Sequence, residues 1–558
     1  MTSTRSLSGL ACALLVACGG GSDEGAPGSG GQASGGAGGA TGGAGGAGGA
    51  GGIAGSAGVG GSAGIAGAAG ISGSGGSGGA PPNCTPSTTY GLDGEAWKPD
   101  GRLLDWAWAG YRTGNVPLPT PASPAKSVTD FGATPDDSTD DTQAFLAAIA
   151  GTPSGVITIP AGKFVISERL EIKKSNLVLR GAGRDKTTLY LPKALGDVYG
   201  LTFNSAGQSN WSFSGGFITV QGSIGGAALA NVTANAKRGE KQLSVSSSAG
   251  FTKGQWVRLL QTDVGGGLLK LFHEGYYPGD VDEDTGKTVF KFASPIAAVE
   301  SGKITLERPL PLDVNTTFTP ELRAFTPSVK EVGVEHLTME FAGTPYPGHF
   351  KEHGYNAIYF QGVSDSWVRD VAVLNSDYGV NLGGSFFCTV TDVVLDTNFD
   401  RGSLTGHHGL NAGGGADLWF TKFDVKKRFI HDLTVDNYAF ATVFSDGKGV
   451  DIDMDHHGRG NYGTLFSALD LGAGNRPFAS GGTAPLRMPH SGARSTYWNL
   501  TAGKDITLPA TDFGPLLTFV SVRGSTGTAS PDWMVENIPP AALCQKDLHA
   551  AMLKKRGP

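Results

Sequence analysis

Five of the eleven histidines fall in one window of the chain, as the pair His407 and His408, the single His431, and the pair His456 and His457. They follow one another at intervals of 24 and 25 residues, counted from 407 to 431 and from 431 to 456. This interval is close to one coil of a β solenoid, in which residues one coil apart stack on the same face. Histidine titrates near neutral pH and can carry protons. The spacing therefore predicts a site where histidines distant in sequence line one surface.

The densest polar run of the chain extends from Val450 to Tyr462. Strand alternation predicts that Val450, Ile452 and Met454 face a core. The same alternation places four residues together on the outer face: Asp451, Asp453, Asp455 and His457. A polar strand flanked by glycines is unusual for packing alone, although a solvated strand is the simpler alternative.

This run contains the groups that an elimination reaction needs. Removal of the C5 proton of a uronic acid and expulsion of the 4-linked oxygen require a base, an acid and a positive group on the carboxylate. His457, paired with His456, is the candidate base and Tyr462 the candidate acid. Arg459 is the candidate uronate clamp, because its planar guanidinium suits a carboxylate.

The segment Gly406-His407-His408-Gly409-Leu410-Asn411 is the second candidate site. His407 and His408 are plausible proton carriers there, and Asn411 is a candidate substrate ligand. Lys422 and Lys426 add local positive charge that could grip an acidic polymer, or they could simply solvate a strand.

The aspartates of the first run allow two other interpretations. Asp451, Asp453 and Asp455 are candidate ligands for calcium, a hard ion that prefers oxygen. No cofactor is required by the sequence, and calcium is the one candidate. Carboxyl pairs also cleave glycosidic bonds by hydrolysis, so a glycoside hydrolase remains an alternative.

A repeated apolar and polar frame indicates how these residues are positioned. It recurs in segments 334–339, 368–373, 390–395, 430–435 and 466–471, whose starts lie 34, 22, 40 and 36 residues apart. Coils with looped-out insertions would give such uneven spacing. His431 lies within this frame beside Asp432, so we interpret it as a structural histidine.

The N-terminal part of this region shows an ordered series of short motifs. They are Asp130-Phe131-Gly132-Ala133, Thr139-Asp140-Asp141-Thr142, Ile159-Pro160-Ala161-Gly162 and Gly181-Ala182-Gly183. After Ser138 or Thr139 as N-cap, Phe145, Ala148 and Ile149 fall on one face of a helix that could cap a solenoid.

Residues 129–192 resemble the pectate lyase superfamily in the order and spacing of these motifs. The resemblance implies an all-β fold, a single-stranded right-handed parallel β-helix, and a secreted or surface protein that acts on polysaccharide. Asn375-Ser376-Asp377 and Gly406-His407-His408-Gly409 also echo two motifs of polygalacturonase-type hydrolases, but their D-D pair and R-I-K motif are missing.

We therefore expect a polysaccharide lyase that cleaves an acidic, uronate-containing polysaccharide. A hydrolase on the same scaffold is the first alternative, and a non-catalytic surface protein that binds carbohydrate is the second. A formal net charge of −7 gives no basic field for nucleic acid. We expect a monomer.

The N-terminus resembles a bacterial lipoprotein signal. An apolar run ends in Leu15-Val16-Ala17-Cys18, which resembles a lipobox. This implies removal of residues 1–17, lipidation of Cys18, and a location in the cell envelope, with Gly19 favouring the outer membrane; ordinary secretion is the alternative. The lipid would be the only contact with the membrane.

The remaining chain divides by composition. Residues 18–83 are rich in Gly, Ala and Ser, which predicts a flexible tether. Residues 84–558 would form the catalytic β-helix, with a small β insertion at about 234–320. The insertion carries aromatic residues that could stack on sugars, namely Phe272, His273, Tyr276 and Tyr277. Cys84, Cys388 and Cys544 leave the disulfide pairing open, and no cysteine spacing resembles a zinc site.

Overall fold

The protein was analysed as a computed structural model. It describes residues 83–557 apart from 123–124, 214, 265–266, 276–287 and 483–488. The expected signal peptide, Cys18, the tether up to residue 82, and Tyr276 and Tyr277 lie outside the described residues. Within the described part, no helix has both the length and the apolar character needed to cross a membrane.

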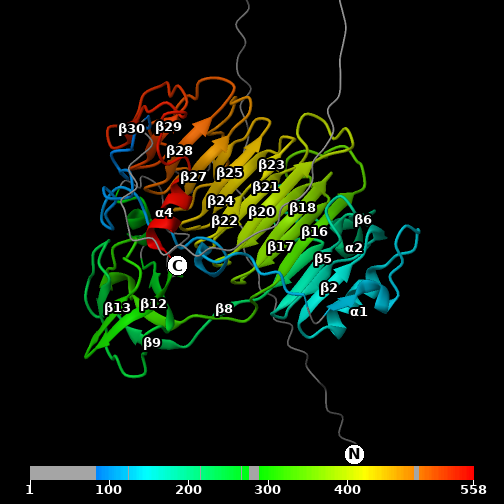
Figure 1. The fold of residues 1–558 in the computed structure, drawn as a ribbon, viewed down its shortest axis with the longest axis horizontal. Coiled ribbons are helices and arrows are strands. Elements are labelled where there is room, and N and C mark those ends of the chain that lie inside the picture. Colours follow the sequence, from blue (N-terminus) through cyan, green and yellow to red (C-terminus); the bar gives the residue numbers. More distant parts are fainter. Residues whose placement is uncertain are drawn as a thin grey trace, which may run out of the picture. The chain divides into compact units, whose positions relative to one another are not determined.

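Two long parallel sheets form the body of the described chain (Figure 1). The strands of the first sheet are β1 (Ala125–Ser127), β2 (Gly155–Ile159), β3 (Gly162–Val165), β5 (Leu177–Gly181), β6 (Thr187–Leu191), β16 (Gly333–Phe341), β18 (Trp367–Leu374), β20 (Thr389–Asp396), β22 (Trp419–Thr421), β23 (Asp424–Val425), β25 (Val443–Gly449), β27 (Leu465–Asp470), β28 (Thr496–Thr501), β29 (Thr518–Val522) and β30 (Met534–Glu536). The strands of the second sheet are β4 (Leu170–Ile172), β7 (Ile218–Gln221), β17 (Asn356–Gln361), β19 (Tyr378–Gly383), β21 (His408–Gly413), β24 (His431–Asp436) and β26 (Met454–His456).

The chain winds from one sheet to the other in successive coils. From β16 to β27, segments of the first sheet alternate along the sequence with strands of the second sheet. A third wall consists of isolated parallel bridges that join Lys330, Ser364, Phe386, Ala416, Phe440 and Tyr462. Each coil therefore lies in parallel register on the one before, and the predicted parallel β-helix is confirmed.

The repeat frame was only partly assigned correctly from the sequence. Val334, Val368 and Val390 do occupy matched positions on neighbouring strands of the first sheet. On the following strand, however, the residue paired with Val390 is Phe420, which is not part of the predicted frame. Segment 430–435 lies in β24, on the second sheet. The two walls share the same alternation of apolar and polar residues, so periodicity alone could not separate them.

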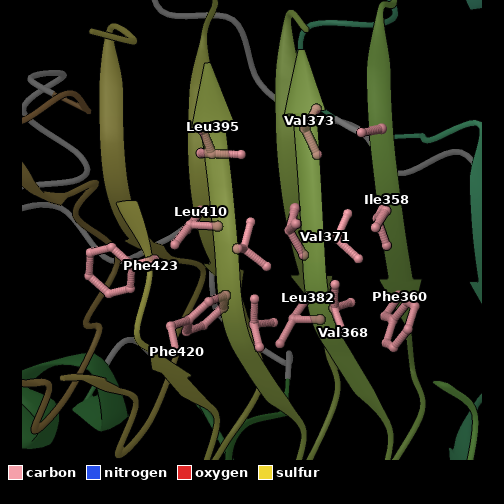
Figure 2. Close-up of a cluster of buried hydrophobic side chains, with 14 of the residues drawn as sticks. Ile358, Phe360, Val368, Val371, Val373, Leu382, Leu395, Leu410, Phe420 and Phe423 are labelled. Carbon is pink, nitrogen blue, oxygen red and sulfur yellow. The ribbon is translucent and has the colours of Figure 1, made fainter. Parts of the chain in front are cut away.

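Apolar side chains from both sheets fill the interior of the coils (Figure 2). Ile358 and Leu410 point inward from the second sheet, and Val371 and Leu395 from the first. Further along the helix the filling becomes aromatic: the rings of Phe420 and Phe444 stack with centroids 4.7 Å apart, and the stack continues through Phe466, Tyr497 and Phe519. Burial of each such ring contributes about 1.5–3 kcal/mol, which makes this column a main source of stability.

A separate antiparallel sheet lies where the sequence indicates an insertion. It consists of β9 (Ala228–Asn231), β10 (Gln242–Ser244), β11 (Trp256–Thr262), β12 (Thr288–Glu300), β13 (Lys303–Leu306) and β14 (Glu321–Ala324). The short strands β8 (Ile224–Gly225) and β15 (Thr326–Pro327) pair at its base. Its Phe290 and Phe292 pack against Phe440 of the third wall, with ring centroids 6.0 and 6.3 Å away.

Short helices and a disulfide complete the described chain. The helices are α1 (Thr142–Gly151), α2 (Leu195–Tyr199), α3 (Gly267–Phe272) and α4 (Leu548–Arg556), with 3-10 turns at Tyr111–Gly114, Val128–Phe131 and Thr316–Phe318. Helix α1 buries Phe145, Ala148 and Ile149 in the main core, as expected for a cap. Its N-cap is Asp141 rather than Ser138 or Thr139. The Asp141 carboxylate accepts hydrogen bonds from the backbone N–H groups of Thr134 and Val165.

Cys84 and Cys544 form a disulfide that joins the two ends of the described chain. The sequence left this pairing open. Cys388 is a free, buried thiol. Since the bridge spans 460 positions, it removes a large amount of conformational freedom from the unfolded chain.

Candidate functional site

A local break in strand alternation brings histidines to the outer face of the second sheet. A regular strand would aim His408 and Leu410 at the same face. Leu410 is buried in the core, but Nδ1 of His408 lies 2.9 Å from the hydroxyl of Thr434, an outward residue of β24. Gly409 permits this change, because a Cβ there would lie 2.6 Å from the Asp432 carbonyl oxygen and 3.2 Å from the side chain of the core residue Leu395. His408 in turn is the register partner of His431.

Five imidazoles meet at this position: His349, His407, His408, His431 and His457. The ring centroids of His407 and His408 lie 4.2 Å apart, and those of His408 and His431 lie 4.8 Å apart. His457 joins on the far side, 5.0 Å from His431. His349 comes from the segment between β16 and β17 and lies 4.7 Å from His407. We call these five residues the histidine cluster.

The histidine cluster opens to solvent at two of its members. His349 is exposed, and the side chain of His457 keeps 17% of its accessible surface. Beside them, the exposed ring of Phe213 lies 5.7 Å from Phe350 and 6.0 Å from His407. Aromatic faces next to polar groups are suited to packing against sugar rings.

Asp455 holds two members of the histidine cluster. Its Oδ2 lies 3.0 Å from Nδ1 of His457 and 3.3 Å from Nδ1 of His431, and its Oδ1 accepts a hydrogen bond from the Gly481 backbone. Burial alone would raise the pKa of Asp455, but the two imidazoles and the Gly481 N–H together lower it below the usual range. The carboxylate is therefore ionised and fixes the orientation of His457.

Glu352 supports the other side of the histidine cluster. Its Oε1 lies 3.5 Å from Nδ1 of His407 and also accepts a hydrogen bond from the Tyr346 hydroxyl. Ser212 donates to its second oxygen. Burial raises the pKa of Glu352, although these hydrogen bonds oppose the shift.

Two arginines near the histidine cluster are held in ion pairs. Arg401 pairs with Asp377, and neither side chain has any exposed surface. Arg476 pairs with Asp432 at 2.5 Å and with Asp453 at 3.3 Å. Because both guanidinium groups are already paired with carboxylates, little of their positive charge is left to attract an acidic substrate.

The buried imidazoles of the cluster are neutral. Burial lowers the pKa of His407 and His408 well below 6.5, and repulsion from neighbouring imidazoles adds to the shift. Burial also lowers the pKa of His431, to about 3. At pH 7 each of these rings therefore keeps a lone pair on one nitrogen, which can accept a proton or bind a metal ion.

Residues 125–235 match the family described as rhamnogalacturonase A/epimerase, pectate lyase-like. This segment is therefore pectate lyase-like, and the parallel sheets that contain part of it form a β-helix. This confirms the family predicted from residues 129–192. No curated protein sequence matches the chain.

Several solved structures resemble this chain only distantly. The Gp54 tailspike of Acinetobacter baumannii bacteriophage AP22 is 9% identical over 71% of this chain and 60% of its own, with a TM-score of 0.35. An exopolygalacturonase from Thermotoga maritima is 9% identical over 74% of this chain and 72% of its own, with a TM-score of 0.28. The AlgE4 A-module, a mannuronan C-5 epimerase of Azotobacter vinelandii, is 13% identical over 73% of this chain and 99% of its own, with a TM-score of 0.24. This chain thus spans about 60% of the tailspike's length. TM-scores this low do not allow the activity of any of these proteins to be assigned to this chain.

The structure brings together some of the residues singled out in the sequence. The stacking of the 407, 431 and 456 regions is confirmed, because β21, β24 and β26 are adjacent. His407, His408 and His457 lie in the histidine cluster, and their catalytic role stays a prediction. Asn411 lies on the same face, where its amide donates a hydrogen bond to the Tyr378 hydroxyl.

Proposing His456 for the site was wrong, whereas the interpretation of His431 as structural is not tested and stays a prediction. His431 lies between His408 and His457 in the histidine cluster. His456 points into the coil interior, where it contacts Asn461 through Nδ1 and the Tyr497 hydroxyl through Nε2. For His456 the cause is the regular alternation of its strand, in which His456 and His457 face opposite sides. In the His407-His408 pair this alternation is broken, and both rings lie in the cluster.

Tyr462 is not placed to act as the acid. It belongs to the third wall and is fully buried, and its hydroxyl donates to the Pro311 carbonyl 3.0 Å away. Arg459 lies on the turn between β26 and the third wall, where Nη1 donates to the side chain of Asn437 at 3.3 Å. Its role as a uronate clamp stays a prediction.

The predicted positive residues lie on the other sheet. Lys422 follows β22, and Lys426 follows β23 and lies 3.9 Å from Asp396. Both therefore belong to the first sheet, whereas the histidine cluster lies on the second. Grouping them with the histidines was wrong, because residues half a coil apart in sequence fall on different walls.

The calcium set is not assembled. Asp451 accepts a hydrogen bond from the Asn475 backbone at 2.7 Å, whereas Asp453 pairs with Arg476 and Asp455 with the histidines. Among the described residues, the groups whose ligand atoms converge are instead His349, His407 and His431, and His431, Asp455 and His457. Val450 is also 47% exposed, so the assumed alternation fails at the start of the run.

Several important residues were missed from the sequence. His349, Phe350 and Glu352 come from one connecting segment, and Phe213 and Gly481 come from two others. The run Gly348-His349-Phe350-Lys351-Glu352-His353 is rich in functional residue types and could have been noticed. Nothing in its spacing, however, relates it to the coil interval.

Proposed function

We propose that this chain acts on polysaccharide and cleaves an acidic, uronate-containing polymer by β-elimination. One observation carries the proposal. His457 combines partial exposure to solvent with a carboxylate partner, Asp455, that fixes its Nδ1. With Nδ1–H directed at Asp455, Nε2 of the ring carries the lone pair and can act as a base.

The proposed reaction uses His457 first as a base and then as an acid. Nε2 of His457 takes the C5 proton of a uronate residue, and the C5–H electrons form the C4–C5 double bond. The bond from C4 to the glycosidic oxygen breaks at the same time or afterwards. The leaving oxygen takes up the proton from the imidazolium, which restores the neutral base. The exposed ring of Phe213 would hold a neighbouring sugar by stacking.

Hydrolysis is less well supported by the same residues. It needs two carboxyl groups that reach the glycosidic bond and the attacking water. The side chains of Glu352 and Asp455 are 1% and 0% exposed, and both contact imidazoles. The groups that face solvent are imidazoles, which favours proton abstraction.

The test uses the purified full-length chain and a panel of pectic, algal and animal uronates. Elimination produces an unsaturated uronate, which absorbs in the ultraviolet. New absorbance together with new chain ends supports the proposal. Reducing ends without absorbance would instead indicate hydrolysis. Uptake of solvent deuterium at C5 without chain cleavage would indicate epimerisation, and binding without any of these changes would indicate a carbohydrate-binding protein.

We also propose that the protein is anchored to the cell envelope through Cys18. The motif Leu15-Val16-Ala17-Cys18 and the Gly-rich segment after it support this proposal. Expression in a bacterial host with a radiolabelled fatty acid should label the chain, whereas the Cys18→Ala variant should stay unlabelled. An unlabelled parent chain would contradict the anchor.

A further inference from the structure

Two histidines from different parts of the chain direct the same ring atom at each other. Nε2 of His349 lies 3.2 Å from Nε2 of His407. A zinc ion with Zn–N bonds of 2.0–2.1 Å in tetrahedral geometry holds two ligand nitrogens about 3.3 Å apart. This separation fits two nitrogens that share an ion as well as it fits a direct N–H···N hydrogen bond.

The third nitrogen comes from His431. The ligand atoms of His349, His407 and His431 all lie within 4.8 Å of one another. The side chain of His431 is only 6% exposed; its Nδ1 lies beside the Asp455 carboxylate, and its Nε2 makes no hydrogen bond within the described chain. A buried polar group without a hydrogen bond costs about 1–3 kcal/mol, so such a ring needs a ligand to compensate it.

Two carboxylates orient the buried rings towards that position. Oδ2 of Asp455 lies 3.3 Å from Nδ1 of His431, and Oε1 of Glu352 lies 3.5 Å from Nδ1 of His407. In metal sites, a histidine commonly directs its second nitrogen at a carboxylate, which fixes the tautomer and leaves the other nitrogen for the ion. Both buried rings therefore present Nε2 as the ligand atom.

We infer that His349, His407 and His431 bind one divalent transition-metal ion, with Zn²⁺ as the representative ion. Imidazole nitrogen suits Zn²⁺ and its transition-metal neighbours, whereas calcium prefers oxygen. Three neutral ligands leave a fourth position for water or substrate. The site is distinct from the calcium set of Asp451, Asp453 and Asp455, which the fold does not assemble.

The ion would also supply a charge that the proposed elimination needs. Stabilising the enolate-like intermediate requires a positive group on the uronate carboxylate. Arg401 and Arg476 are held in buried ion pairs. A divalent ion on three neutral ligands keeps its full charge and can accept the uronate carboxylate at the fourth position. This part of the inference rests on the proposed function, whereas the metal site itself does not.

Metal binding is tested first, without any substrate. The full-length chain is freed of metal with a chelator and titrated with ZnCl₂ by calorimetry, and with Co²⁺ by visible absorption. We expect one ion per chain and, for Co²⁺, visible absorption bands of a four-coordinate ion, the geometry that zinc sites favour. His349→Ala should weaken metal binding roughly tenfold or more, because it removes one ligand. Glu352→Gln should weaken metal binding by about 10–100-fold, because Glu352 contacts the ligand His407 and fixes its ring.

Two features of the design keep this test decisive. His349 is exposed, so its variant should fold even if His407→Ala or His431→Ala does not. His336→Asn is the matched control, because His336 also pairs with an aspartate, 2.7 Å from Asp370, but on the first sheet. Absence of stoichiometric binding, or equal affinity of His349→Ala and the parent, overturns the metal site.

The role of the ion is tested separately from its binding. If the metal-free chain loses uronate cleavage and Zn²⁺ restores it, both the site and its role are supported. Full activity of the metal-free chain overturns the role of the ion but leaves the elimination intact. Stoichiometric metal binding without cleavage of any uronate supports the site and contradicts the proposed function.

Discussion

Nε2 of His349 and Nε2 of His407 lie 3.2 Å apart, although 58 positions separate the two residues. One residue lies in a connecting segment and the other directly before a strand of the second sheet. Their contact shows that the candidate site is built jointly by the stacked coils and by a loop that folds over them. Its chemistry therefore depends on residues that no single coil contains.

Replacement of His457 by asparagine should greatly reduce uronate cleavage. His457 is the partly exposed imidazole that Asp455 orients, and loss of a general base costs about 10²–10⁴-fold in rate. The measurement is kcat from the absorbance of the unsaturated product, with circular dichroism to verify the fold. His336→Asn should stay near the parent value, since its His-Asp pair lies on the first sheet. Parent-like kcat in His457→Asn would remove this residue from the mechanism.

Replacement of Phe213 by alanine should weaken substrate binding more than catalysis. Its ring is 39% exposed and lies 6.0 Å from His407, where it can stack on a sugar. We expect KM to rise about tenfold while kcat changes little, because stacking of this kind contributes about 1 kcal/mol beyond the buried area. Phe399→Ala is the control, since Phe399 is similarly exposed at 41% but follows β20 of the first sheet. Equal KM values for both variants would argue against a sugar platform at Phe213.

Replacement of Gly481 by alanine should disturb the histidine cluster without a change of charge. A Cβ at this position would lie 2.3 Å from the His457 ring and 2.9 Å from the His431 ring, so both rings would have to move. A displacement of about 1 Å in a catalytic group can cost about 10²-fold in rate. In the control Gly225→Ala, the nearest atom is 3.5 Å away, and activity should persist. If both variants are equally active, His457 does not need its present position.

The free energy of unfolding should fall as the pH decreases from 7 to 5. Burial lowers the pKa of His273 and His456 to about 4 and that of His549 to about 3, against about 6.5 in an unfolded chain. Below pH 6.5 the unfolded chain therefore binds protons that the folded chain does not. Each such histidine contributes a loss of about 1 kcal/mol per pH unit until its folded pKa is reached.

Thermal unfolding between pH 7.5 and 5 checks this dependence on pH. The Tm should decrease over this range, and His456→Gln should show a shallower decrease because one of the titrating groups is removed. A Tm that stays constant or rises towards pH 5 would contradict the neutral, buried state of these histidines.

Much of the fold could be predicted, because it depends on local patterns. The motifs from Asp130 to Gly183 and the alternation around Val334, Val368 and Val390 arise from strand geometry and tight turns, which the sequence encodes directly. The assignment failed at segment 430–435. The same alternation suits either wall, and only the register with His408 places that segment on the second sheet.

The sequence by itself determined the solenoid, the coil interval and the stacking of the 407, 431 and 456 regions. Only the tertiary structure decided which side chains face outward, because the break at Gly409 reverses the alternation that a regular strand would follow. It also decided that His456 and Tyr462 are buried while His349, Glu352 and Phe213 contribute to the site. These choices depend on loop paths and on contacts between distant coils, and neither is fixed by the spacing of residues along the chain.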